Sequence, residues 1–183
     1  MAIISAVEQS LIDEALKHAE KRIAFEYDRF KLETNHRISM IALGTLGQLI
    51  FRDYLVSKGV EFEFEYQAGR FDRYDFMLEE KVIEIKTSGY DDSEGWAKLH
   101  AIYNKDQMRD AVNKNIYGSV QIFVNGYDRK ERRLIPSNCS QAVIAGWAPI
   151  GVIRSAPIRD LPYGSAHMVP LVTLEEIDTL IGY

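Results

Sequence analysis

Residues 74–87 read Tyr-Asp-Phe-Met-Leu-Glu-Glu-Lys-Val-Ile-Glu-Ile-Lys-Thr. Two short apolar runs flank a charged Glu-Glu-Lys break at residues 79–81, and this pattern is typical of two strands joined by a tight turn. If the turn is centred on residues 79 and 80, Phe76 lies opposite Ile83 in the neighbouring strand. The stretch therefore predicts a β-hairpin whose register is fixed by its turn.

The register of this hairpin brings charged side chains together. Asp75 lies opposite Glu84, and Lys86 shares their face because side chains alternate along a strand. Like charges directly opposite each other are unfavourable, and a divalent cation bound by carboxylate oxygens would resolve the conflict. Asp72 is a rival for Asp75, but in this register it falls on the other face. Two interpretations remain: a metal-dependent hydrolase site, or a solvated strand face with mixed charges.

Composition limits the classes of protein to consider. The chain has 183 residues, of which 46% are hydrophobic and 27% charged, as in ordinary globular proteins. A net charge of −5 argues against a polyanion-binding module coated with lysine. The single cysteine, Cys139, excludes internal disulfides and cysteine-ligated metal centres, and we expect it to be small and partly buried. With no basic-then-apolar leader and no long apolar run, we expect a cytoplasmic protein that does not bind membranes.

Periodicity predicts the order of the remaining elements. Before the hairpin we expect a helix over 6–27, a second helix over 38–57 that stops at Lys58-Gly59, and a strand with one wet face over 60–66. After it we expect a loop over 89–95, a helix over 105–114 and a buried strand over 119–125. The remainder predicts a turn over 126–133, bent strands over 143–153, a loop over 154–165 and a terminal helix capped by Thr173 with Glu176.

Asp…Glu-x-Lys on the second and third strands of a meander, in this order of elements, resembles the PD-(D/E)xK nuclease superfamily. Restriction endonucleases, Holliday-junction resolvases and many repair nucleases share its core. The resemblance covers residues 38–125 and implies an α/β fold with a restriction-endonuclease-like core. In that fold a central mixed β-sheet is flanked by helices, in the order α-α-β-β-β-α-β, here with a β-rich C-terminal tail. We expect one domain over 1–183, with an N-terminal helical part over about 1–58 and an extension over about 126–183.

The resemblance also assigns roles to the hairpin residues. Asp75 and Glu84 correspond to the metal-binding carboxylates, the backbone carbonyl of Ile85 to an additional ligand, and Lys86 to the catalytic lysine. The family often carries a glutamate on the preceding helix, after Gly-x-x-Gly. Here the matching stretch is Gly-Thr-Leu-Gly-Gln, so Gln48 stands at that catalytic position. This departure puts a second metal ion in doubt, because an amide oxygen binds a cation without contributing charge.

Residues outside the hairpin are candidates for contact with a nucleic acid. Arg70 and Arg73 precede the proposed site, and Lys105 and Gln107 fall on the helix that follows it. A basic cluster over 129–133 is a further candidate, consisting of Arg129, Lys130, Arg132 and Arg133. The alternative for this cluster is a solvated loop tip.

The sequence thus supports two functions from different classes. The first is an endodeoxyribonuclease that uses Mg²⁺ or Mn²⁺ to activate water, with DNA as partner and, by resemblance, 5′-phosphate and 3′-hydroxyl products. Cutting both strands would favour a two-fold homodimer. The second is a catalytically inactive nucleic-acid-binding or assembly module, motivated by Gln48 and the acidic net charge. An unrelated α/β enzyme with merely solvated hairpin charges is a third, weaker interpretation.

Overall fold

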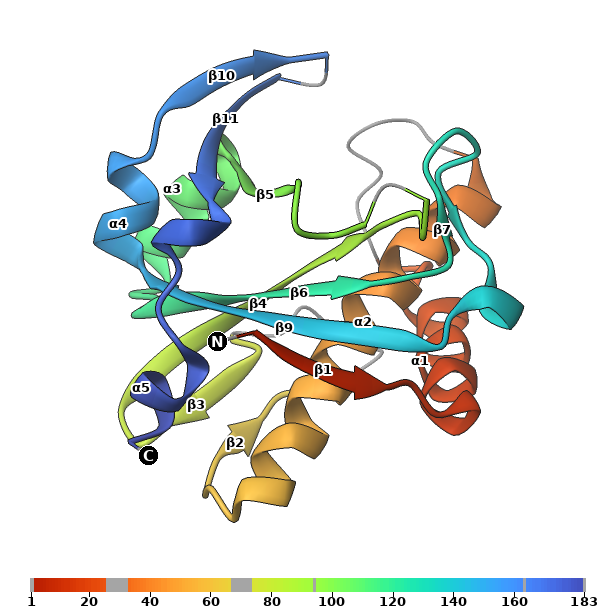
Figure 1. The fold of residues 1–183 in the computed structure, drawn as a ribbon, viewed down its shortest axis with the longest axis horizontal. Coiled ribbons are helices and arrows are strands. Elements are labelled where there is room, and N and C mark those ends of the chain that lie inside the picture. The colour runs from red at the N-terminus through yellow and green to blue at the C-terminus, as the bar shows by residue number, and fades with distance from the viewer. Residues whose placement is uncertain (1, 26–32, 67–73, 94, 163, 183) are drawn as a thin grey trace.

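The computed structural model describes residues 2–25, 33–66, 74–93, 95–162 and 164–182. Its centre is a curled six-stranded mixed sheet in the order β1-β9-β6-β4-β3-β2 (Figure 1). Strands β4 and β6 are parallel, and the other neighbouring pairs are antiparallel. The strands are β1 (Ile3–Ala6), β2 (Glu63–Phe64), β3 (Phe76–Leu78), β4 (Lys81–Gly89), β6 (Gly118–Val124) and β9 (Gln141–Pro149).

Helices α1 (Gln9–Arg22) and α2 (Thr34–Lys58) pack together and cover one face of this sheet (Figure 1). Leu46 and Leu49 of α2 are fully buried and lie in one hydrophobic cluster with Ile83 of β4. Helix and strand approach so closely that a Cβ atom at Gly47 would collide with the side chain of Thr87. The hydrophobic contact therefore fixes where α2 lies on the strand that carries Glu84 and Lys86.

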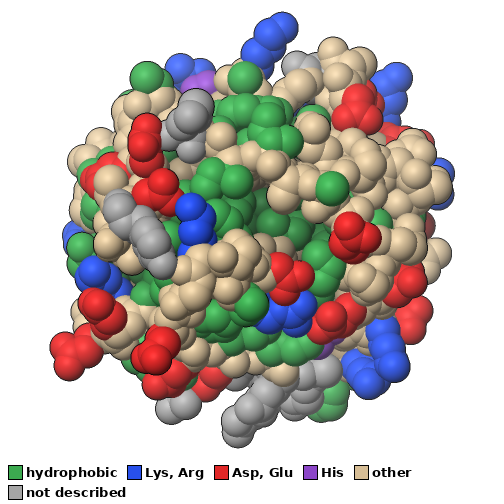
Figure 2. Space-filling model, turned by 60° about the horizontal axis from the view of Figure 1, so that its bottom comes forward, with side chains coloured by type: hydrophobic (Ala, Val, Ile, Leu, Met, Phe, Trp, Pro, Cys, Tyr) green, Lys and Arg blue, Asp and Glu red, His purple; other side chains and the backbone are tan. Residues whose placement is uncertain are grey.

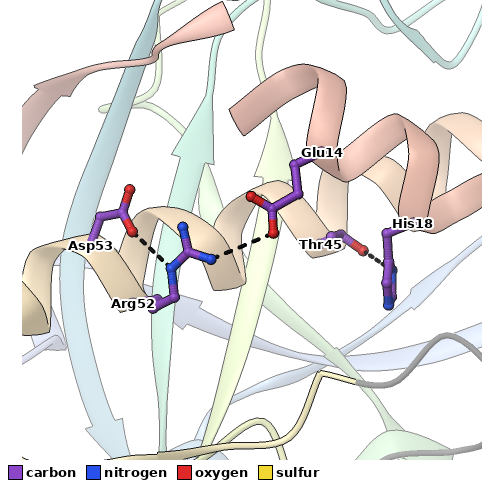
Figure 3. Close-up of polar contacts among 5 residues, drawn as sticks. All are labelled: Glu14, His18, Thr45, Arg52 and Asp53. Carbon is purple, nitrogen blue, oxygen red and sulfur yellow. Dashed lines mark hydrogen bonds and ion pairs between the residues drawn. The ribbon is translucent and has the colours of Figure 1, made fainter. Parts of the chain in front are cut away.

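Polar contacts join α1 to α2 along their exposed side (Figure 3). Arg52 Nη1 lies 3.5 Å from Glu14 Oε1, and Arg52 Nε donates a hydrogen bond of 2.8 Å to Asp53 Oδ1. Deeper between the helices, His18 Nδ1 and Thr45 Oγ1 are 3.2 Å apart. These groups connect two helices that the apolar core already holds together.

The opposite face of the sheet carries a second, smaller layer (Figure 1). It consists of a three-stranded antiparallel sheet in the order β10-β11-β5 and two short helices. Ala101, Tyr103 and Met108 from this layer form a buried cluster with Ala148 and Ile153. The elements are β5 (His100–Asn104), α3 (Lys105–Asn113), α4 (Ile150–Ser155), β10 (Ile158–Leu161) and β11 (Gly164–Pro170).

Two further elements complete the fold. A small hairpin, β7 (Tyr127–Asp128) and β8 (Arg133–Leu134), follows β6, and α5 (Ile177–Ile181) lies near the C-terminal end. A hollow between the end of α2, the β3–β4 turn and α5 is lined in part by Leu78, Leu180 and Ile181. Figure 2 turns the lower end of Figure 1 forward and shows hydrophobic side chains gathered in the hollowed middle of that face. The hollow lies at the start of β4, away from Lys86.

The hairpin prediction is confirmed in detail. Phe76 pairs with Ile83, and the turn is centred on residues 79 and 80, with Glu79 in the left-handed region at φ 54°. The predicted helices over 38–57 and 105–114 correspond to α2 and α3, and the buried strand over 119–125 to β6. Gly59 ends α2 in the left-handed conformation, as expected, and Cys139 is buried.

Other predictions from the sequence are wrong. The order α-α-β-β-β-α-β misses β1 before α1 and β5 between the hairpin and α3. Of the strand expected over 60–66, only two residues are paired, and they lie at the edge of the sheet. Phe62, Phe64 and Tyr66 nevertheless pack on the core. The helix expected over 6–27 begins only at Gln9.

The C-terminal part contains three more corrections. Residues 150–153, predicted as bent strand, belong to helix α4, because Pro149 ends β9 and Ile153 packs into the second layer. The loop expected over 154–165 contains β10, which pairs with β11. Thr173 does not cap the last helix: its hydroxyl donates to the carbonyl of Pro170, and Glu176 is the N-cap residue of α5. In the described part of the chain, no helix is long and apolar enough to cross a membrane.

Candidate active site

The carboxylate of Asp75 is fixed at the point where the pairing of β3 and β4 ends. The last paired residues are Phe76 and Ile83, and beyond them the backbone N–H of Ile85 donates to Asp75 Oδ2 at 2.7 Å. Gln48 Nε2, on helix α2, donates to Asp75 Oδ1, also at 2.7 Å. Two short hydrogen bonds to different oxygens therefore hold the carboxylate in one orientation.

Glu84 and Lys86 lie on the face of β4 that is turned away from α2. Ile83 and Ile85, which alternate with them, are buried in the cluster that includes α2. Tyr103 of β5 lies over this second face, with its ring centroid 5.9 Å from Lys86 Nζ. The lysine is thus enclosed between the strand and the second layer, beside two carboxylates.

The charge state of Lys86 reflects this enclosure. Burial lowers the pKa of its ammonium group, while the carboxylates of Glu84 and then Asp75 raise it; burial is the larger effect, and the pKa falls below its ordinary value. Both acids therefore act electrostatically on one ammonium group. The structure brings Gln48, Asp75, Glu84, Ile85 and Lys86 into one site.

The neighbouring strand adds polar residues that the sequence analysis did not identify. In the parallel pairing of β4 with β6, Glu84 lies beside Ser119 and Lys86 beside Gln121. The hydroxyl of Tyr103 donates to Ser119 Oγ at 3.0 Å, with both residues buried. Ser119 and Gln121 alternate with Val120 and Ile122 in an otherwise apolar strand. This alternation is the sequence signal from which the two residues could have been identified.

Gln121 is the most unusual of these residues because it is fully buried. Its Nε2 donates to Ser88 Oγ at 3.3 Å and to the carbonyl of Ile122 at 3.0 Å. Its Oε1 has no hydrogen-bond partner among the residues that the structure describes. A buried acceptor without a donor costs about 1–3 kcal/mol, so this oxygen is expected to be satisfied by water or by a bound group.

The donor atoms at this site suit a single hard cation. The two carboxylates of Asp75 and Glu84 could supply oxygen ligands. The carbonyl of Ile85 is directed to the same side of β4 as its N–H, which contacts Asp75. Over the described ranges, no group of three or more His, Cys, Asp or Glu side chains is placed to hold a metal ion. A site with two acids and a backbone carbonyl fits Mg²⁺, which keeps several waters, better than it fits a caged metal.

The structure describes only some of the residues that were predicted to contact DNA. Lys105 is exposed at the first residue of α3. Gln107 belongs to the same helix, but its side chain lies outside the description. Arg70 and Arg73, together with the rival acid Asp72, lie outside the described residues.

Comparison with protein-family models, with curated proteins and with solved structures found no match to this chain. The function is therefore inferred from the site itself.

Proposed function

We propose that this protein is a nuclease of the PD-(D/E)xK type that hydrolyses DNA phosphodiester bonds with Mg²⁺ or Mn²⁺. One observation carries the proposal: the Asp75 carboxylate is fixed by Gln48 and the Ile85 N–H beside Glu84 and Lys86. A restriction-endonuclease-like core, formed by the mixed sheet and its flanking helices, is part of this proposal.

Each residue has a role that follows from its position. Asp75, Glu84 and the carbonyl of Ile85 would hold the cation, which when bound polarises the scissile phosphate and lowers the pKa of a water molecule. Gln48 orients Asp75 through its hydrogen bond. Lys86 places a positive charge where negative charge develops on the phosphate, and its N–H groups can orient the attacking water.

The competing function is a module that binds nucleic acid or a protein partner without cleavage. Gln48 favours it specifically, since its amide already supplies Asp75 with a neutral hydrogen-bond donor at the position where the family often has a second acid. Such a module would bind DNA in a salt-dependent way and leave it intact.

A cleavage assay with a matched pair of variants separates the two functions. Supercoiled plasmid, linear duplex, branched and single-stranded DNA are incubated with wild type, Glu84→Gln and Glu80→Gln, in Mg²⁺, Mn²⁺ or EDTA. Both variants remove one carboxylate charge, but Glu80 is exposed in the hairpin turn. We expect metal-dependent cleavage by wild type and Glu80→Gln and none by Glu84→Gln. Intact substrates in every wild-type reaction, together with salt-dependent binding, would leave only the non-cleaving module.

A further inference from the structure

The small hairpin β7–β8 carries the basic cluster that the sequence singled out. We call residues 127–134 the basic hairpin. It contains two acidic residues, Asp128 and Glu131, and four basic ones, all of them exposed: Arg129, Lys130, Arg132 and Arg133. The whole chain has a net charge of −5, whereas residues 127–134 carry four positive and two negative charges.

The tip of the basic hairpin has a defined backbone. Asp128 Oδ1 accepts hydrogen bonds from the N–H groups of Lys130 at 2.9 Å and Glu131 at 3.0 Å. Arg132 adopts the left-handed conformation, with φ 48°. Asp128 is thus turned onto the backbone of its own tip, and the four basic residues around it are exposed.

The base of the hairpin is attached to the strand that carries Lys86. The Tyr127 N–H donates to the carbonyl of Tyr90 at 3.3 Å, and the Tyr127 ring packs so closely on Gly89 that a Cβ atom there would collide with it. Gly89 ends β4 three residues after Lys86, about 10 Å along an extended strand. The base of the basic hairpin is therefore attached a short distance beyond the candidate active site.

The direction of this attachment matters as well. Strands β4 and β6 are parallel and end together at Gly89 and Val124, and Figure 1 shows the hairpin projecting beyond those ends. Duplex DNA rises about 3.4 Å for each base pair, so the roughly 10 Å from Lys86 to the base of the hairpin corresponds to about three base pairs.

We infer that the basic hairpin contacts the phosphate backbone of duplex DNA a few base pairs from the phosphate held at Asp75, Glu84 and Lys86. This inference rests on the proposed function, because it takes that site as the place where the scissile phosphate binds. The contact positions the duplex through charge, and base sequence plays no part in it.

The test compares two double variants with the same change in charge. Lys130→Gln/Arg133→Gln alters the basic hairpin, and Lys17→Gln/Lys21→Gln alters two exposed lysines of α1. Binding to a fluorescein-labelled 30-base-pair duplex is followed by anisotropy at several salt concentrations, in EDTA so that the DNA stays intact. A duplex RNA of the same length serves as a second probe.

For the hairpin variant, we expect the slope of log K against log salt to become shallower by about 1.8, which is 0.9 for each of two lost phosphate contacts. The affinity should fall about tenfold at moderate salt. The α1 variant should keep the wild-type slope and affinity. Single-turnover cleavage at saturating protein should stay within twofold of wild type in the α1 variant, which changes neither the basic hairpin nor the site.

The outcomes separate the inference from the proposed function. Wild-type affinity and slope in the hairpin variant, or an equal loss in the α1 variant, would overturn the inference even if the DNA is cleaved. Tighter binding of the RNA duplex would overturn duplex DNA as the partner. A shallower slope confined to the hairpin variant supports the contact between the basic hairpin and DNA. If neither wild type nor any variant cleaved DNA, that contact would stand and the nuclease would be refuted.

Discussion

Two clusters in this protein contain the same charges in different surroundings. Between α1 and α2, Arg52 lies beside Glu14 and Asp53 (Figure 3). At the candidate active site, Lys86 lies beside Glu84 and Asp75. Each cluster has one cation and two carboxylates. In the first, the side chains of Arg52, Glu14 and Asp53 are 27%, 41% and 48% exposed, so water shares in solvating every charge.

The surroundings of the two clusters shift the pKa values of their cations in opposite directions. Burial lowers the pKa of Arg52, but the hydrogen bond and charge of Asp53, with the charge of Glu14, outweigh it and the pKa rises. At Lys86 burial prevails over both carboxylates and the pKa falls. The two clusters thus carry the same formal charge of −1, but water screens it at the α1–α2 cluster, whereas in the enclosed cluster a bound cation would have to balance it.

The largest expected difference between the clusters is in catalysis. Lys86→Met should lower the single-turnover cleavage rate by about 100-fold or more, since it removes a group that acts on the reacting phosphate. Arg52→Met, which also removes one cation, should leave the rate within twofold. Rates are measured on the DNA that wild type cleaves best, in Mg²⁺. Equal losses in both variants would mean that Lys86 has only a structural role.

A gain of metal affinity is the next largest effect. Gln48→Glu places a third carboxylate at Asp75, and the added charge should tighten Mg²⁺ binding about tenfold in calorimetry. In EDTA the same variant should melt at a lower temperature than wild type, because two carboxylates replace an amide–carboxylate hydrogen bond. Gln9→Glu, at an exposed position of α1, is the control and should not change Mg²⁺ affinity. An unchanged affinity in Gln48→Glu would place the cation elsewhere.

Stabilisation by bound metal is expected at one of the two clusters only. At Mg²⁺ ten times its dissociation constant, the free energy of unfolding of wild type should rise by about 1.4 kcal/mol, because the folded state alone binds the ion. Glu84→Gln should lose this increment, and Glu14→Gln, in the α1–α2 cluster, should keep it. Urea unfolding with and without Mg²⁺ measures the difference. An increment that survives in Glu84→Gln would contradict a site built on that residue.

The smallest expected effect concerns the exposed cluster itself. Glu14→Gln should cost less than about 1 kcal/mol of unfolding free energy, because partly exposed ion pairs contribute little. The cost should shrink further at 1 M salt, which screens surface charges within a few ångströms. Urea unfolding at low and high salt tests this. A loss well above that size, unaffected by salt, would show that the cluster is as enclosed as the one at Lys86.

The parts of the fold that could be predicted from the sequence depend on local signals. The alternation around a two-residue turn fixed the register of Phe76 with Ile83, and that register led to Asp75, Glu84 and Lys86. The spacing of apolar residues in α2 and its Gly59 stop are equally local. These signals need no knowledge of distant segments.

The missed elements depend on distant partners. Strand β1 has four residues and is stabilised by pairing with β9, as Ile3 with Ile144. Strand β5 pairs with β11 through Tyr103 and His167. Helix α4 is rich in β-branched residues, which favour strands, and its conformation follows from packing of Ile153 in the second layer.

The same reason explains which site residues were missed. Ser119 and Gln121 join the site only through the parallel pairing of β4 with β6, and Tyr103 only through the position of β5. A local pattern can show that a strand carries polar residues. It cannot show that they lie beside Glu84 and Lys86.

The most direct test of the metal site is calorimetric titration of Mg²⁺ and Mn²⁺ into wild type and Asp75→Asn, each alone and with a short DNA duplex. We predict one binding site in wild type that is lost in Asp75→Asn, because the variant replaces the carboxylate held by Gln48 and Ile85. Identical isotherms for the two proteins, or no binding by wild type even with DNA present, would contradict the assignment of this site to a metal ion.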